Sequence, residues 1–334
     1  MDSTTWHSRL IQAFQTMILL VLIAYLVSSL SFRELGKVLL HLNIGWLIVP
    51  ILLHLGAVWL NAYRWMILLN DDSCGVPLWR LAYSQIVGQF FNVFLPSDMG
   101  GDVYKMHDIH KFCKSPGKSV VSVLMTRVFG FLMMGVTLAM GIIISHNIIR
   151  LKCVFWMATI YSSLAILFII LLIEGNWLRL DLKKKEIKNK YFLKLVSIFD
   201  ELCKMTINRK LVLSALFLAL VFQILLIVVI FFYGLTVNVI LPFHNLFLIA
   251  PLIMLISALP ISINSMGLRE GAFVYFLNWL GLANEQGMII ALLSRSVSGV
   301  IIPLLGGILF ILFRKHIDKS SENIGANDSK AECP

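Results

Sequence analysis

Charged residues are scarce in this chain, and that scarcity excludes an ordinary soluble protein. Only 14% of the 334 residues are Asp, Glu, Lys or Arg, whereas a soluble domain has about 25%. Hydrophobic residues make up 59% of the chain, and the mean hydropathy is +0.86. Apolar runs of roughly 20 residues, which are long enough to cross a bilayer, recur along the sequence. The composition therefore predicts an integral membrane protein.

Cysteine pairs and the motifs of soluble enzymes are also missing. The five cysteines are scattered and no two form a C-x-x-C pair, so we predict neither a disulfide framework nor a zinc site. The sequence has no Walker loop, no G-x-S-x-G, no H-E-x-x-H and no dinucleotide fingerprint. We expect no metal and no cofactor. Whether the chain is an enzyme stays open at this point.

The charge that is present is mostly positive and lies between the apolar runs. The net charge is +10. In a soluble protein it would suggest nucleic acid as a partner, but Lys and Arg gathered between spans are typical of cytoplasmic loops. Contact with anionic lipid head groups is a compatible interpretation. We therefore expect residues 105–118, the basic loop 175–210, the N-terminal residues 1–13 and the tail 314–334 to be cytoplasmic, with no nucleic-acid partner.

Six apolar segments predict full transmembrane helices, and two others predict broken helices. The broken segments are 78–95, which ends at Pro96, and 245–259, which ends at Pro260 and is followed by a short apolar run at 271–282. Unpaired backbone groups in hydrocarbon cost several kcal/mol each, so such segments must be enclosed by protein or line a wet cavity. We expect an all-α polytopic membrane protein with two re-entrant or broken segments and spans at about 14–32, 45–69, 119–145, 153–174, 211–233 and 287–313.

The order of these segments repeats along the chain. Residues 14–145 hold two spans, a broken segment and a third span, and residues 153–313 hold the same series. Because three crossings is an odd number, the second repeat would be inverted relative to the first. Inverted repeats with broken helices are a design of transporters. Residues 187–209 are either a helix on the membrane surface or a basic loop, and the tail 314–334 is expected to be disordered.

Two arginines lie eight residues inside predicted spans. Arg127 is therefore about 12 Å deep at a rise of 1.5 Å per residue, and Arg295 is equally deep from the other side. A buried arginine costs about 2.5–3.5 kcal/mol on the insertion scale, so it persists where it meets an anion. That anion is either a lipid phosphate, which suits the guanidinium fork, or an internal carboxylate of Asp98, Asp102 or Glu270. Both interpretations stay open.

Polar residues gather in the two broken segments. Their glycines permit tight turns whose N–H groups could hold a phosphate, and their amides and Lys105 could bind its oxygens. Alternatively, the polar groups satisfy one another in structural turns. Arg64, near the inner end of its span, is expected to snorkel to the interface. No catalytic residue is predicted, and the candidate binding residues besides Arg127 and Arg295 are Gln89, Asn92, Pro96, Asp98, Gly100, Gly101, Asp102, Lys105, Asn264, Gly267, Arg269 and Glu270.

The same segments carry a family resemblance. The phrases N-x-x-L-P-x-x-x-G-G-D-x-Y-K at 92–105 and L-P…G-x-R-E at 259–270, followed by Arg295 and Pro303, resemble the transmembrane domain of lysylphosphatidylglycerol synthase/flippase proteins. The resemblance covers about residues 10–313. It implies a bundle with inverted repeats that moves aminoacylated or otherwise modified phospholipids between leaflets, with relatives implicated in handling polyprenyl-linked glycans.

Two departures from the family pattern matter. Relatives often have Glu before the buried arginine, whereas this chain has Thr126 before Arg127. The family's aminoacyl-transferase domain is soluble and C-terminal, but this chain ends about 20 residues after its last predicted span. We therefore do not expect it to make a lysyl-lipid by itself.

The expected function is that of a lipid flippase-like protein in a bacterial or archaeal cell membrane, with both termini inside. Its partners would be membrane lipids with anionic, modified or polyprenyl-phosphate-linked head groups. One alternative is an integral-membrane transferase, in which Asp98, Asp102 or Glu270 would act as an acid or base. Another is a membrane partner of a separately encoded lipid or glycan synthase or transferase.

Overall fold

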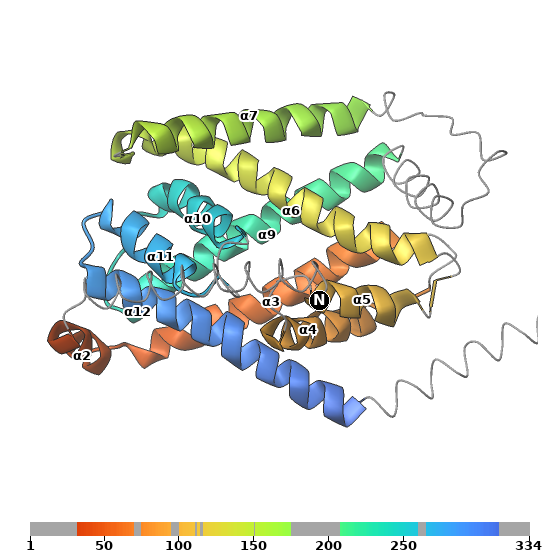
Figure 1. Ribbon diagram of the computed structural model, residues 1–334, viewed down its shortest axis with the longest axis horizontal. Coiled ribbons are helices and arrows are strands. Elements are labelled where there is room, and N and C mark those ends of the chain that lie inside the picture. Colours follow the sequence, from red (N-terminus) through yellow and green to blue (C-terminus); the bar gives the residue numbers. More distant parts are fainter. Residues whose placement is uncertain are drawn as a thin grey trace, which may run out of the picture. The chain divides into compact units, whose positions relative to one another are not determined.

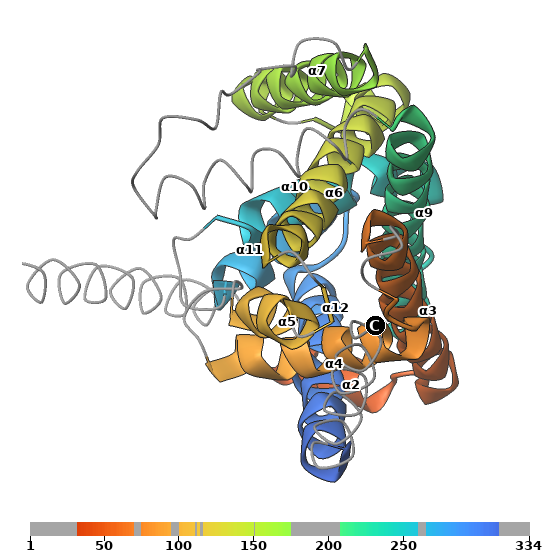
Figure 2. The same cartoon turned by 90° about the vertical axis from the view of Figure 1, so that its right-hand side faces the viewer.

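The computed structural model of the chain is described over eight ranges, within which every regular element is helical (Figure 1 and Figure 2). Nearly all of the predicted span at 14–32 lies outside the described residues. So do residues 175–207, the tail 314–334, Pro96, Asp98 and Asn264. The described ranges are 32–69, 75–94, 100–110, 112–113, 116–149, 151–174, 208–259 and 265–313.

Five of the described helices are long and apolar enough to cross a membrane. Both ends of each helix lie within three residues of the ends of a predicted span. The prediction of an all-α polytopic membrane protein is therefore confirmed. The fifth helix passes through a π-helical turn, Ser296–Ile301, and continues to Phe313. The five are α3 (Ile44–Leu69), α6 (Pro116–Ser145), α7 (Lys152–Glu174), α9 (Arg209–Thr236) and the helix that begins as α12 (Asn284–Arg295).

Each predicted break, at Pro96 and at Pro260, lies between two short helices that pack against each other. The first pair is α4 (Leu78–Phe94) and α5 (Gly100–His110), and the second is α10 (Phe243–Ser257) and α11 (Leu268–Asn278). The longest of them has 17 residues, or about 26 Å of helix, which falls short of a hydrocarbon core of about 30 Å. Each pair therefore forms a helical hairpin.

Two shorter elements complete the described chain. The helix α2 (Phe32–Leu40) precedes α3 and packs against α12, and the sequence had not predicted it as a separate element. A 3₁₀ turn, His146–Ile148, directly follows α6 and begins the connection to α7.

Helix lengths repeat along the chain. The series α3, α4, α5 and α6 has 26, 17, 11 and 30 residues. The series α9, α10, α11 and the helix from Asn284 to Phe313 has 28, 15, 11 and 30. The two predicted repeats and the inversion of the second stay predictions.

The chain divides into two compact units, and the boundaries between them fall inside the long helices. The hairpin α10–α11 belongs to the first unit and α4–α5 to the second. Both units take residues from both predicted repeats, so they are described one at a time. Unit 1 is Met1–Ala57, Gly130–Ile169 and Leu220–Ser298, and unit 2 is Val58–Phe129, Ile170–Ala219 and Gly299–Pro334.

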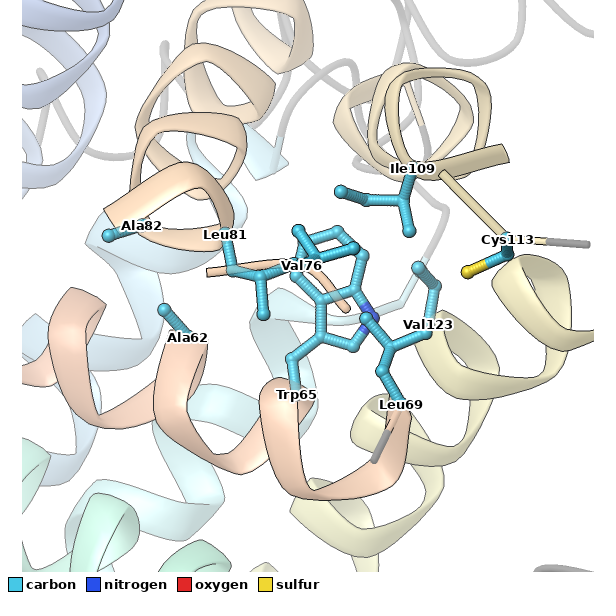
Figure 3. Packing of buried hydrophobic residues seen from close by; sticks show 9 residues of the cluster. All are labelled: Ala62, Trp65, Leu69, Val76, Leu81, Ala82, Ile109, Cys113 and Val123. Atoms are coloured by element: carbon cyan, nitrogen blue, oxygen red, sulfur yellow. The ribbon is translucent and has the colours of Figure 1, made fainter. Parts of the chain in front are cut away.

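The core of unit 2 is built around Trp65 of α3 (Figure 3). Its indole Nε1 donates a hydrogen bond of 3.0 Å to Ser122 Oγ of α6, so the one polar atom of this buried ring is satisfied. Side chains from α3, α4, α5 and α6 pack around Trp65. They hold α4 and α5 against α3 and α6. Those side chains include Ala62, Leu69, Leu81, Ala82, Ile109 and Val123.

Cys113 lies at the edge of the same core (Figure 3). It is disulfide-bonded, a feature that the scattered cysteines did not predict. Cys153 is a free and exposed cysteine, so the partner of Cys113 lies outside the described residues.

The core of unit 1 brings α6 and α10 into backbone contact. A Cβ atom added at Gly141 of α6 would lie 2.4 Å from the backbone nitrogen of Leu248, so only glycine permits this approach. Large side chains from α9, α10 and α11 fill the same unit and are less than 2% exposed. They include Tyr233, Leu246, Phe273 and Phe276. The unit thereby fixes the start of α11, where its polar residues lie.

Candidate functional site

The first polar cluster is in unit 2 and consists of Asp102, Lys105 and Arg127. Asp102 is the third residue of α5, where a carboxylate is favoured by the helix dipole. Its Oδ2 accepts a hydrogen bond from Arg127 Nε of α6, and its Oδ1 lies 2.7 Å from Lys105 Nζ. The Asp102 side chain is only 8% exposed. One buried carboxylate is therefore held by two cations.

One face of α4 supports this first cluster. Gln85, Gly88 and Asn92 follow one another at spacings of three and four residues, so they share a helix face. Gln85 Oε1 accepts a hydrogen bond of 3.2 Å from Lys105 Nζ, and Asn92 Oδ1 accepts one from the backbone N–H of Gly101. A Cβ at Gly101 would lie 2.1 Å from the carbonyl oxygen of Gly88. The two helices therefore cross at a pair of glycines.

The position of these residues sharpens the predictions for the first broken segment. The N–H of Gly101, which could have held a phosphate or been satisfied within the protein, is bonded to Asn92. Gly100 is buried at the start of α5. Sequence reasoning chose Gln89 and missed Gln85, which lies one turn earlier. The spacing of Gln85 from Asn92 along one helix face was the signal that could have found it.

Arg64 of α3 does not snorkel, so that prediction is wrong. The residue is only 4% exposed in unit 2, and its Nη2 donates to Asn61 Oδ1 at 2.5 Å. It also acts electrostatically on Lys105, as Arg127 does. Enclosure by protein supplies polar neighbours that lipid cannot, so the guanidinium need not reach the interface. Arg64 thus belongs to the surroundings of the first cluster.

Unit 2 also contains a separate buried ion pair. Arg80 of α4 donates to Asp108 Oδ1 of α5, and both residues are buried. The Arg80 guanidinium lies 5.2 Å from the ring centroid of Tyr83 and 5.4 Å from that of Phe112, a favourable arrangement for a cation. This pair joins the start of α4 to the end of α5.

The second polar cluster is in unit 1 and consists of Arg269, Glu270 and Arg295. Glu270 is the third residue of α11. Its Oε1 accepts a hydrogen bond from Arg295 Nε, and its Oε2 accepts one of 2.8 Å from the N–H of Gly267. Gly267 has φ +76°, which glycine adopts without strain. Glu270 therefore caps its own helix while it pairs with an arginine.

Arg269 joins the start of α11 to the π-helical turn. Its Nη2 donates to Ser294 Oγ at 2.7 Å, and its Nη1 donates to Ser298 Oγ at 3.2 Å. Ser298 lies within the turn. Turns of this kind interrupt the regular helical hydrogen bonds and are frequent at functional sites. The second cluster thus surrounds an irregular stretch of backbone.

The two arginine–carboxylate pairs follow one plan. Asp102 and Arg127 are 25 residues apart, and so are Glu270 and Arg295. In both pairs the carboxylate is the third residue of a short helix, and the arginine donates through Nε. In the described structure each arginine therefore pairs with an internal carboxylate, which is one of the two predicted interpretations. A role of the arginines in lipid binding stays a prediction.

The arrangement favours anion binding over bond making. In each pair the carboxylate already accepts a hydrogen bond from the arginine. An arginine can exchange a carboxylate for a phosphate, because both oxyanions match its planar donors. Among the described residues, no three His, Cys, Asp or Glu side chains are grouped as metal ligands.

Comparison with known proteins places this arrangement in a family. No curated protein and no solved structure matches the chain. The family model described as the lysylphosphatidylglycerol synthase TM region matches residues 12–306. The match spans both helical hairpins and both polar clusters. The chain therefore belongs to the lysylphosphatidylglycerol synthase transmembrane-region family.

Proposed function

We propose that the chain is a flippase-like protein, which binds anionic or modified phospholipid head groups, or polyprenyl-phosphate-linked ones, and moves them between leaflets. One observation carries the proposal: a buried arginine–carboxylate pair occurs twice at the same spacing. Arginine is costly at bilayer depth. Two arginines in the same arrangement favour a shared role in binding an anion over two unrelated structural ion pairs.

Head-group binding would proceed by exchange. A phosphate that enters either cluster would take the place of Asp102 or Glu270 on the guanidinium of Arg127 or Arg295. Because each cluster is already polar, the head group would find hydrogen-bond partners there while the acyl chains stay in lipid. Alternating exposure of the two repeats would then follow the transporter design.

The remaining predicted residues extend this proposal. Gln89 of α4, Gly100 and Gly267, together with Arg269 of the second cluster, would contact the head group or shape its site. Pro96, Asp98 and Asn264 lie outside the described residues and stay predicted parts of the site. Lys and Arg in the loops support a cell-membrane location with both termini inside.

A transport assay tests the proposal. The purified protein is reconstituted in vesicles with a fluorescent anionic phospholipid, and the amount in each leaflet is followed by quenching from outside. We expect the Arg127→Ala, Arg295→Ala double variant to lose at least tenfold in rate. The Lys152→Ala variant, which removes an exposed cation on α7, should match the wild type. Equal rates for the double variant and the wild type would contradict the site assignment.

Folding is controlled within the same assay. The double variant Arg127→Lys, Arg295→Lys keeps both charges and loses only the planar fork, so it should retain more transport than the alanine variant. A vesicle preparation in which neither the wild type nor this variant moves any lipid faster than protein-free vesicles would contradict the proposed function itself.

A further inference from the structure

We infer that each arginine–carboxylate pair is one half of a two-part lipid site, whose other half is an exposed leucine three residues earlier on the same helix. The arginine would bind the phosphate of a lipid. The leucine, Leu124 in the first site and Leu292 in the second, would contact the first segment of that lipid's hydrocarbon chain. Such a site rests on the function proposed above, and it determines the form in which the ligand is recognised: an intact amphiphile that enters sideways from the bilayer.

In both pairs the arginine is the more exposed member. The Arg127 side chain is 34% exposed, whereas that of Asp102 is 8% exposed. The Arg295 side chain is 19% exposed, whereas that of Glu270 is 7% exposed. Each pair therefore reaches from the interior of its unit toward the surface, with the arginine on the outer side. A ligand that arrives from outside the unit would meet the arginine before the carboxylate.

An exposed leucine precedes each arginine by three residues. Leu124 of α6 is 43% exposed, and Leu292 of α12 is 41% exposed. Residues three apart are neighbours on a helix surface, with about 5–6 Å between their Cβ atoms, so each leucine shares a helix face with its arginine. The residue type, the spacing and the exposure therefore match in the two sites.

Both leucines lie at bilayer depth. Leu124 is the ninth residue of α6, and Leu292 is the ninth residue of α12. Each helix has 30 residues when α12 is followed through the π-helical turn, which corresponds to about 45 Å. The ninth residue is about 12 Å from the helix start, which is inside a centred hydrocarbon core of about 30 Å. An exposed leucine suits lipid chains at that depth, whereas an exposed arginine requires an anion.

A lipid with a phosphate meets both requirements in one molecule. Its phosphate is an oxyanion that matches the planar donors of a guanidinium, and its hydrocarbon chain gains contact with the leucine. The glycerol unit between them can bridge two neighbouring positions of one helix. A soluble phosphate ester has no chain to place on the leucine and must leave water to reach this depth. We therefore expect it to bind far more weakly than the lipid.

Photolabelling in vesicles tests the inference on the full-length chain. The vesicles are phosphatidylcholine with a small fraction of phosphatidylglycerol that carries a diazirine near the start of one acyl chain. Labelled residues are identified by mass spectrometry after irradiation. We expect labelling at Leu124 and at Leu292 to exceed that at Leu164 of α7 at least fivefold. Leu164 is the matched control, because it is a leucine on a long apolar helix and is 60% exposed.

Variants and competitors identify the two parts of each site. Arg127→Ala should lower labelling at Leu124 at least threefold and leave Leu292 and Leu164 unchanged, and Arg295→Ala should lower it at Leu292 alone. Arg127→Lys keeps the charge and should lose less labelling than the alanine variant. Unlabelled dioleoyl phosphatidylglycerol should compete at Leu124, whereas glycerol 1-phosphate at the same concentration should not. If an alanine variant fails to fold, this competition on the wild type carries the comparison.

Three results would overturn the inference. They are labelling at Leu124 and Leu292 no higher than at Leu164, labelling that neither the arginine variants nor the competing phospholipid lower, and equal competition by glycerol 1-phosphate. Failure of the proposed function gives a different result. Arginine-dependent labelling without lipid movement in vesicles would contradict the flippase-like function and leave the two-part site intact. Lipid movement with equal labelling at all three leucines would contradict the inference alone.

Discussion

The two polar clusters have the same spacing between carboxylate and arginine, but the charge of the carboxylate is stabilised by different partners in each. Asp102 is held by two side-chain cations, Lys105 and Arg127. Glu270 is held by Arg295 and by the N–H of Gly267 at the start of its own helix. The charge of Asp102 is stabilised by charged side chains, whereas that of Glu270 is stabilised partly by the backbone of its own helix. Equal spacing in the sequence therefore does not imply equal electrostatics, and substitutions in matched positions can measure the difference.

The largest effect is expected from neutralising the two carboxylates one at a time. Asp102→Asn leaves two buried or half-buried cations without their carboxylate, so it should destabilise the protein by about 3–5 kcal/mol. Glu270→Gln leaves one such cation, and its amide oxygen can still accept from the Gly267 N–H. Its cost should be at least about 1 kcal/mol smaller. Denaturant titration in mixed micelles compares the two variants.

A second substitution on Asp102→Asn identifies the cause. Adding Lys105→Met removes one of the two cations that Asp102 had held and should recover part of the lost stability. Two results would contradict the proposed difference between the clusters. One is a larger loss of stability for Glu270→Gln than for Asp102→Asn, and the other is no recovery of stability in the double variant.

Glycine substitutions in the two hairpins should give the next largest difference. Gly101→Ala forces a Cβ to within 2.1 Å of the Gly88 carbonyl oxygen, so it should cost about 3 kcal/mol, the upper end for overpacking. Gly271→Ala in α11 meets nothing within 4 Å. It should be neutral or stabilising by up to about 1 kcal/mol, because alanine is the better helix former.

The same titration in mixed micelles measures both glycine variants. Equal stability of Gly101→Ala and the wild type would show that α4 and α5 do not approach as closely as the described backbone requires. It would also remove the argument that the hairpin positions Asn92 and Lys105.

The smallest effect concerns the hydroxyl groups around Arg269. Ser298→Ala removes an acceptor from a charged donor and should cost about 1–2 kcal/mol. Ser296→Ala is the matched control in the same π-helical turn. Its exposed hydroxyl donates a hydrogen bond to Leu292 O of its own helix, so its loss should cost less than about 0.5 kcal/mol. Equal losses of stability for the two variants would contradict a stabilising hydrogen bond between Arg269 and Ser298.

The spans could be predicted from the sequence because bilayer thickness dictates their length and composition. The hairpins were predictable too, because Pro96 and Pro260 interrupt apolar runs that are too short to cross. The helix α2 was not predicted, since its nine residues are too few for the span criterion to recognise. The first span, which lies almost entirely outside the described residues, and the inversion of the repeats stay predictions.

The site was only partly predictable, since depth in a span identifies a costly arginine but not its partner. Arg127 had three possible carboxylates, and only the packing of α5 on its neighbours selects Asp102. Arg64 was assigned to the interface because its position along the helix says nothing about which neighbours enclose it. Gln85 was missed for a related reason: the face of α4 that meets α5 is set by the crossing of two glycines.

The π-helical turn at Ser296–Ile301 changes the angular phase of the last long helix. Each residue of an α-helix turns the next by about 100°, and a π turn takes in an extra residue without a matching advance along the axis. The residues that follow the turn therefore have a rotational position about the helix axis that differs from the one a regular α-helix would give them. A deletion of one residue within the turn would rotate the residues that follow it by about a quarter of a revolution, so Gly306 would no longer face the backbone of Ile86.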